Sequence, residues 1–172
     1  HGYFNLGGHN SGKLHEAVVT VNADKVTHKG NNNCPDGSYI DVDGTIFDFR
    51  KGNPLGQVLV LDNDQTKNAL GVDQNFCIND YDGTYRFASR MEDCRSSRVM
   101  EVYTNMAGVQ LYAGNHLGGD DQKGDVPYAP YGALCMEAQM YPNAVNIPEF
   151  PSVILRPGKT KYYCCGYKFS NK

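Results

Sequence analysis

Residues 98–158 read RVMEVYTNMAGVQLYAGNHLGGDDQKGDVPYAPYGALCMEAQMYPNAVNIPEFPSVILRPG, and this stretch carries most of what the sequence says about the fold. Two strand-like runs, residues 97–104 and 108–113, are separated by a short turn. Further along, one carboxylate, Glu137, lies in the apolar run ALCMEAQM. It is either a solvent-facing strand residue or a buried acid with a chemical task. Burial would raise its pKa and make it a better base near neutral pH.

Short extended runs continue through the rest of the chain. Clusters of Gly, Asn, Asp and Pro separate them, and no helical periodicity lasts beyond a turn or two. This pattern predicts an all-β fold, an antiparallel sandwich or barrel. No repeat or linker divides residues 1–172, so we expect one structural unit. The remaining strand-like runs are residues 15–23, 38–43, 45–50, 57–61, 74–79 and 85–89.

Composition excludes several classes of function. The formal charge of −3, from 16 basic and 19 acidic residues, provides no electrostatic footprint for nucleic acid. No apolar run approaches the roughly 20 residues of a membrane span. The six cysteines lack zinc-ligand spacing and favour reduced thiols, with disulfides as the alternative. The sequence opens HGYFNLGG, without an initiator Met or a signal peptide, which predicts a processed chain or part of a longer one.

Four polar residues stand beside aromatic or apolar strand segments and are candidates for chemistry. They are His1 in HGYFNL, Asp73 in GVDQNFCI, Gln110 in GVQLYAGN and Glu137. None is specific alone, because a terminal His, an Asp after Gly-Val and a strand Gln all have ordinary structural explanations. No phosphate-binding glycine loop and no nucleophile elbow is present.

Five motifs together resemble the galactose mutarotase (aldose 1-epimerase) family over essentially the whole chain. The resemblance implies an antiparallel β-supersandwich of which this chain is the C-terminal part. The strongest matches are GVQLYAGN and PNAVNIPEFPSVILRPG, because they agree with the family in order and spacing. The motifs are HGYFNL (1–6), VDGTIFDFR (42–50), GVDQNFCI (71–78), RVMEVYTNMAGVQLYAGNHLGG (98–119) and ALCMEAQMYPNAVNIPEFPSVILRPG (133–158).

The resemblance also implies an activity: interconversion of the α and β anomers of free hexoses such as galactose and glucose, without a cofactor or metal. Glu137 matches the family's base, which removes the proton from anomeric O1, and His1 matches the acid, which protonates ring oxygen O5. Asp73 and Gln110 match residues that bind sugar hydroxyls. Ordinary pKa values of about 4.3 for Glu and about 6.5 for His let a carboxylate and an imidazolium coexist at mildly acidic to neutral pH.

The chain departs from the family pattern in three places. Gly2 replaces a Ser in the first motif, and residues 130–133 read PYGA where the family often has His-Ser-Gly-Phe, a change expected to alter the pocket wall or the substrate range. The family segment that precedes His1 supplies several strands, an Asn-Arg pair and a second His. We therefore expect residues 1–172 to pair with a separate N-terminal chain or to belong to a longer protein. Without that segment, apolar sheet surface and strand edges would be exposed.

Two other functions remain open. A non-catalytic sugar-binding or structural protein could reuse the strands, although packing alone does not require His1, Asp73, Gln110 and Glu137 together. An epimerase-like enzyme for phosphorylated hexoses is less favoured, because the sequence has no Arg cluster for phosphate. Family habit and the lack of secretory signs favour the cytoplasm, with an extracellular location as the alternative.

Overall fold

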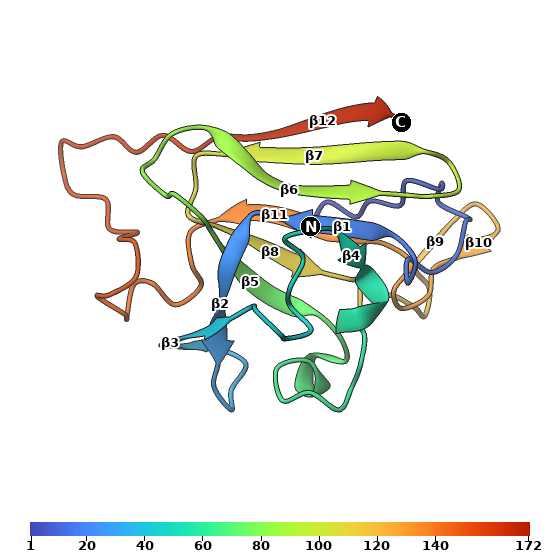
Figure 1. The fold of residues 1–172 in the computed structure, drawn as a ribbon, viewed down its shortest axis with the longest axis horizontal. Helices are drawn as coiled ribbons and strands as arrows, with labels where there is room; N and C mark the ends of the chain where they lie inside the picture. Colours follow the sequence, from blue (N-terminus) through green and yellow to red (C-terminus); the bar gives the residue numbers. More distant parts are fainter.

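Two five-stranded antiparallel sheets face each other in the computed structural model, which describes all of residues 1–172 (Figure 1). We call them sheet I, with strand order β12-β7-β6-β1-β4, and sheet II, with order β11-β8-β5-β2-β3. The all-β prediction is confirmed, since two short 3-10 turns are the only helical elements. Neither turn has the length and hydropathy that a membrane span requires.

The strands are short, and both tight turns and longer loops join them. Sheet I consists of β1 (Val18–Val21), β4 (Asn53–Pro54), β6 (Arg86–Glu92), β7 (Arg98–Thr104) and β12 (Cys165–Asn171). Sheet II consists of β2 (Ala23–Lys29), β3 (Pro35–Asp41), β5 (Asp73–Ile78), β8 (Gly108–Tyr112) and β11 (Cys135–Gln139). The other elements are the hairpin β9 (Gln122–Lys123) and β10 (Val126–Pro127) and the 3-10 turns η1 (Leu55–Val58) and η2 (Lys67–Ala69).

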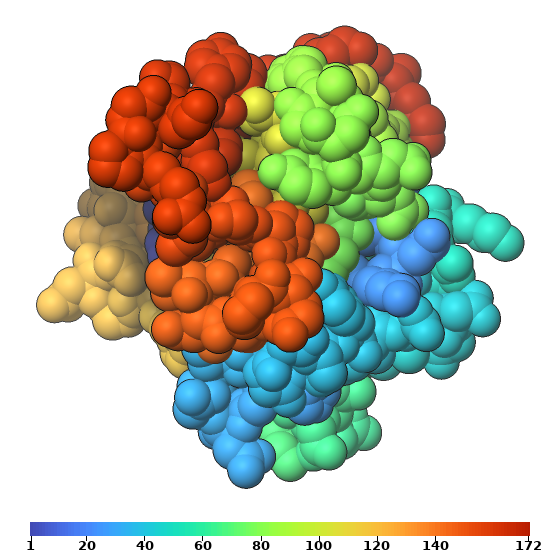
Figure 2. Space-filling view, turned by 90° about the vertical axis from the view of Figure 1, so that its left-hand side faces the viewer, coloured from blue at the N-terminus to red at the C-terminus, as the bar shows by residue number.

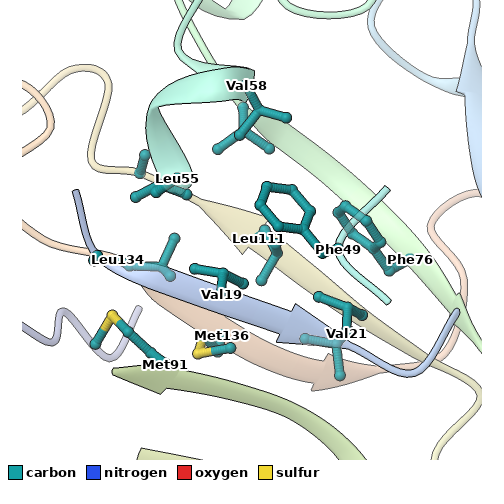
Figure 3. Packing of buried hydrophobic residues seen from close by; sticks show 14 of the residues in the cluster. Val19, Val21, Phe49, Leu55, Val58, Phe76, Met91, Leu111, Leu134 and Met136 are labelled. Atoms are coloured by element: carbon teal, nitrogen blue, oxygen red, sulfur yellow. The ribbon is translucent and has the colours of Figure 1, made fainter. Parts of the chain in front are cut away.

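Apolar side chains from the facing surfaces of the two sheets form one core of 25 buried residues. Sheet II contributes Phe76, Leu111 and Met136, and sheet I contributes Val19 and Met91 (Figure 3). Burying each such side chain stabilises the fold by roughly 1.5–3 kcal/mol. Because side chains alternate along a strand, the residues between these core positions point to the opposite face of each sheet.

One predicted strand is two strands in the structure. Residues 15–23 were expected to be a single extended run, but β1 ends at Val21 and β2 begins at Ala23 in the other sheet. Asn22 is the corner: its N–H donates to the carbonyl of Ala88, and its carbonyl accepts from the N–H of Asn79. The chain therefore crosses between the layers at a residue whose backbone groups remain paired.

The predictions of strands at residues 45–50 and 57–61 are wrong. In the first run, local partners replace strand pairing: the Phe47 N–H donates to the Thr45 hydroxyl, which itself donates to the carbonyl of Val42. Such short hydroxyl side chains bond nearby backbone N–H and C=O groups that would otherwise pair with a neighbouring strand. Residues 55–58 form η1 instead of a strand, and Gln57 donates to the carbonyl of Ile46.

The segment after β11 folds back over the second surface of sheet II. In Figure 2 this segment lies against β2 and β3. Tyr141 and Phe150 belong to a small second core, and Phe150 also contacts Tyr39 of β3 at a ring separation of 5.5 Å. Asn143 donates to the carbonyl of Pro35. Sheet II is thus covered at its β2–β3 end, while its β8–β11 end carries the polar residues described next.

Candidate active site

Three of the four predicted site residues lie on neighbouring strands of sheet II. Glu137 in β11 is directly opposite Gln110 in β8, and Gln110 is opposite Asn75 in β5. Asp73, two residues before Asn75, projects to the same side. We call this surface the polar face of sheet II, defined by Asp73, Asn75, Gln110, Glu137 and Gln139. It is the reverse side of the strands that supply Phe76, Leu111 and Met136 to the core.

His1 reaches the same face from the other end of the sequence. Its Nε2 lies 3.8 Å from Oε1 of Glu137. Its ring stacks on Tyr3 with a centroid separation of 5.6 Å and meets Tyr112 edge-on at 5.2 Å. Phe4 fixes the segment to sheet II through a two-way backbone bridge with Leu134, which precedes β11. The structure therefore brings all four predicted residues together.

Asp73 is held both by its side chain and by its backbone. Gln110 Nε2 donates to the Asp73 carboxylate over 2.6 Å. The Lys29 ammonium donates to the Asp73 carbonyl over 2.8 Å. Burial lowers the pKa of Lys29, and the charge of Asp73 partly opposes that change. The Lys29 backbone is itself fixed, because buried Gln65 bonds both its N–H and its carbonyl.

Electrostatics distinguish Glu137 from an ordinary surface carboxylate. Burial raises the pKa of the Glu137 carboxyl, and the negative charge of Asp73 adds to the rise. The side chain is 28% exposed, so a ligand can still reach it. The neighbouring Cys135 thiol is unsuited to nucleophilic chemistry, because burial and the charge of Glu137 raise its pKa to about 12. The arrangement places a carboxylate and an imidazole within reach of one small polar ligand.

Four residues of this site were not predicted from the sequence. Gln139 donates to both Asn75 and Gln110 on this face, Lys29 supports Asp73, and Tyr112 packs against His1. A signal for the first two was present, because D-x-N at residues 73–75 and E-x-Q at residues 137–139 place polar groups at every second position of a strand. Nothing in the local sequence pointed to Lys29 or Tyr112.

A groove lies next to Tyr3, the residue that stacks on His1. It has a volume of about 640 Å³ and lies between the N-terminal segment, the β9–β10 hairpin and the exposed edge strand β12. Tyr3 lines it, and so do Phe4, Leu6 and Phe169, the last of which is 59% exposed. No cluster of three or more His, Cys, Asp or Glu side chains is placed to hold a metal ion.

Comparison with known proteins identifies the family of this chain. The family model described as aldose 1-epimerase matches residues 1–168. The chain belongs to the aldose 1-epimerase family. Galactose mutarotases of Rattus norvegicus and Homo sapiens are 38% and 39% identical to it over 99% of its length, and the aldose 1-epimerase of Escherichia coli (strain K12) is 30% identical over 98%.

Solved structures of this family share the fold. A GalM/aldose epimerase homologue from C. elegans superposes with a TM-score of 0.77, and galactose 1-epimerase from Lactobacillus acidophilus NCFM with a TM-score of 0.78, each at 28% identity over 98% of this chain. The family resemblance and its fold are thus confirmed. The chain spans about half the length of the relatives it matches: 48% of the rat and human proteins and 49% of the C. elegans structure.

Proposed function

We propose that this chain carries the chemistry of an aldose 1-epimerase, interconverting the α and β anomers of free hexoses such as galactose and glucose. The observation that supports it most is the 3.8 Å separation of Glu137 Oε1 and His1 Nε2 on a face that also presents Asp73 and Gln110. Mutarotation needs one group to take a proton from O1 and another to give a proton to O5. Both oxygens are bonded to the same carbon, so the two groups must lie close together.

In the proposed mechanism, the Glu137 carboxylate removes the O1 proton, the electron pair of the O1–H bond becomes the second bond of the C1=O1 carbonyl, and the C1–O5 bond breaks with its electrons going to O5. The imidazolium of His1 donates a proton to O5 as the bond breaks. Rotation about C1–C2 turns the other carbonyl face toward O5, and the same steps in reverse close the ring and restore both groups. The raised pKa of Glu137 favours this role, because a stronger base receives the proton more readily. The cycle balances without a cofactor.

Asp73 and Gln110 would hold the sugar during these transfers. The carboxylate only accepts hydrogen bonds, whereas the amide can both donate and accept, so the pair suits hydroxyl groups, which do both. Fixing the ring keeps both proton transfers within hydrogen-bond reach. Lys29 and Gln65 keep the backbone of Asp73 in place.

A polypeptide corresponding to the other half of the relatives would complete the site, either as a separate chain or within one longer chain. The His1 side chain is 53% exposed, which leaves the proposed acid open to solvent. The groove bordered by Phe4 and Phe169 presents apolar surface next to it, and β12 has an unpaired edge. Native mass spectrometry of the protein from its source tests this: a stable, unpaired species of 19.0 kDa would argue against it.

Polarimetry with fresh α-D-galactose and α-D-glucose tests the catalytic proposal. We expect Glu137→Gln to slow anomer exchange by roughly 10²–10⁴-fold, the usual contribution of a general base. The matched control is Glu101→Gln, which neutralises a strand carboxylate paired with Lys168 on sheet I. Its rate should equal that of the wild type.

The same measurement separates the catalytic proposal from the sugar-binding alternative, which the exposure of His1 favours. If the wild type and Glu137→Gln both match the rate in buffer, this chain is not a mutarotase by itself. Retained sugar binding in that case would identify it as a binding protein.

A further inference from the structure

Three side-chain amides form a hydrogen-bonded chain behind Asp73, and we call this chain the amide relay: Gln110, Gln139 and Asn75. Gln110 Nε2 donates to the Asp73 carboxylate over 2.6 Å. Gln139 Nε2 donates to Gln110 Oε1 and also to Asn75 Oδ1, each over 3.0 Å. Gln139 therefore joins β11 to both β8 and β5 by side-chain bonds.

The direction of the relay is set from its Asp73 end. An ionised carboxylate only accepts, so Gln110 must turn its nitrogen toward Asp73 and its oxygen toward Gln139. Gln139 must then present its nitrogen to Gln110, and the same nitrogen requires the oxygen of Asn75. If the three amides turned over together, the oxygen of Gln110 would face the carboxylate of Asp73. One charge thus fixes the orientation of three neutral groups.

Packing encloses the Asn75 end of the relay, whereas Gln110 and Gln139 are half-buried. Asn75 is only 2% exposed. Gly108 lies opposite both Gln139 and Cys77, and a Cβ at this position would come within 2.4 Å of Asn75 Oδ1 and 3.2 Å of the Tyr141 ring. The missing side chain at Gly108 therefore leaves room for the Asn75 amide. Burial makes a wrongly turned amide costly at Asn75, since water cannot replace the lost partner there.

We propose that Gln139 and Asn75 are positioning residues, which orient the Gln110 amide so that its second N–H is offered to a sugar oxygen between Asp73 and Glu137. That N–H has no acceptor in the protein, because Gln110 Nε2 bonds only to Asp73. The role in sugar binding rests on the proposed function. The orientation of the relay does not, since it follows from bonds within the free protein.

A double-mutant cycle tests the orientation without any sugar. Gln139→Glu leaves the Gln110 amide between two carboxylates, each of which can only accept a hydrogen bond. Its single nitrogen can satisfy one of them, so its oxygen must face the other. We therefore expect the Tm to fall by about 3–5 °C. With Asp73→Asn the relay can run the other way: the amides at 110 and 75 donate to the new carboxylate, and Gln110 Oε1 accepts from the amide at 73. In that background Gln139→Glu should lower the Tm by only about 1 °C.

The matched control is Gln139→Glu combined with Glu137→Gln. Residue 137 is on the same strand and face, two positions from 139, so neutralising it relieves simple charge repulsion without reversing the relay. We expect this pair to recover less stability than the pair with Asp73→Asn. Equal or greater recovery with Glu137→Gln would overturn the proposal, as would additivity of Asp73→Asn and Gln139→Glu. If Gln139→Glu alone does not fold, the comparison of the two double variants decides.

Galactose titration then tests the functional part. Gln139→Met removes the donor without adding charge and should weaken galactose binding about tenfold, the loss expected for a misdirected hydrogen bond near a charged group. Unchanged affinity with an intact stability cycle would confine the relay to a structural role and overturn its part in binding. If the wild type itself binds no sugar, the proposed function fails while the stability cycle still judges the orientation.

Discussion

The outward surfaces of the two sheets carry carboxylates in opposite circumstances. On sheet I, Glu101 pairs with Lys168 at 3.1 Å, and Glu92 lies 2.7 Å from both Arg90 and Lys172. On the polar face of sheet II, Glu137 faces only an imidazole and forms no ion pair with lysine or arginine. The pKa values diverge accordingly: hydrogen bonds from Lys172 and Arg90 lower that of Glu92, whereas burial raises that of Glu137.

The comparison separates carboxylates that stabilise the fold, on sheet I, from carboxylates that remain available to a ligand, on sheet II. The carboxylates of sheet I already have cationic partners, and the Glu101 pair links neighbouring strands β7 and β12, so these groups offer little to a ligand. The carboxylates of sheet II are surrounded by amides, an imidazole and a lysine that bonds a backbone carbonyl instead of a carboxylate. They therefore remain able to bind a ligand. A raised pKa in an accessible site marks a candidate functional group.

Adjacent residues of β8 give the largest expected contrast. Leu111 points into the core and Gln110 to the polar face. Leu111→Ala should lower the free energy of unfolding by about 2–5 kcal/mol, because it leaves a cavity. Gln110→Ala should lower it by only about 1 kcal/mol. Urea denaturation measures both, and equal losses would contradict the division of sheet II into a core face and a polar face.

Glu92→Gln tests the paired carboxylates. We expect a loss of about 1 kcal/mol at pH 7, since Glu92 is nearly buried and bonds two cations. The pKa of Glu92 is lowered in the folded protein. Its ionised carboxylate therefore stabilises the fold at pH values above its ordinary pKa of 4.5, and this stabilisation is lost as the pH falls below that value. Thermal unfolding of both proteins across pH 3–7 should therefore converge at the acidic end. A pH-independent difference would assign the effect to packing.

Glu137→Gln should change stability in the opposite direction from Glu92→Gln, and by a smaller amount. The folded pKa is raised, so the ionised carboxylate costs stability above its ordinary value of 4.5. The variant should gain about 1 °C in Tm at pH 7, and the gain should vanish below pH 4.5. A variant that is less stable at neutral pH would show that Glu137 serves the fold and would weaken its assignment as a base.

The sequence predicted the fold class and four residues that the structure places on one face, but not the contacts that support them. Alternation identified β5, β7 and β8, and family motifs pointed to His1, Asp73, Gln110 and Glu137. The strand β12 was missed because an exposed edge strand has no buried face to impose a pattern. The run at 45–50 was mistaken for a strand because its apolar side chains are buried in the core although its backbone forms a loop.

The amide relay could not be predicted from its parts. Asn75 and Gln139 are 64 residues apart, and their bond depends on the register that places both strands beside β8. Register is a tertiary property, fixed by which faces are buried, and a one-residue slip would turn every polar group into the core. Sequence spacing shows which residues share a face, whereas the strand order decides which of them meet.

Mapping galactose binding by ¹⁵N–¹H correlation spectra tests most directly whether the polar face of sheet II is the sugar site. Both faces are compared in one sample, because every strand reports its own amide signals. We predict shifts at the β5, β8 and β11 positions around Asp73, Gln110 and Glu137, and none along β7 or β12 at Glu101 and Lys168. Shifts confined to sheet I, or none on either sheet with excess galactose, would contradict the assignment.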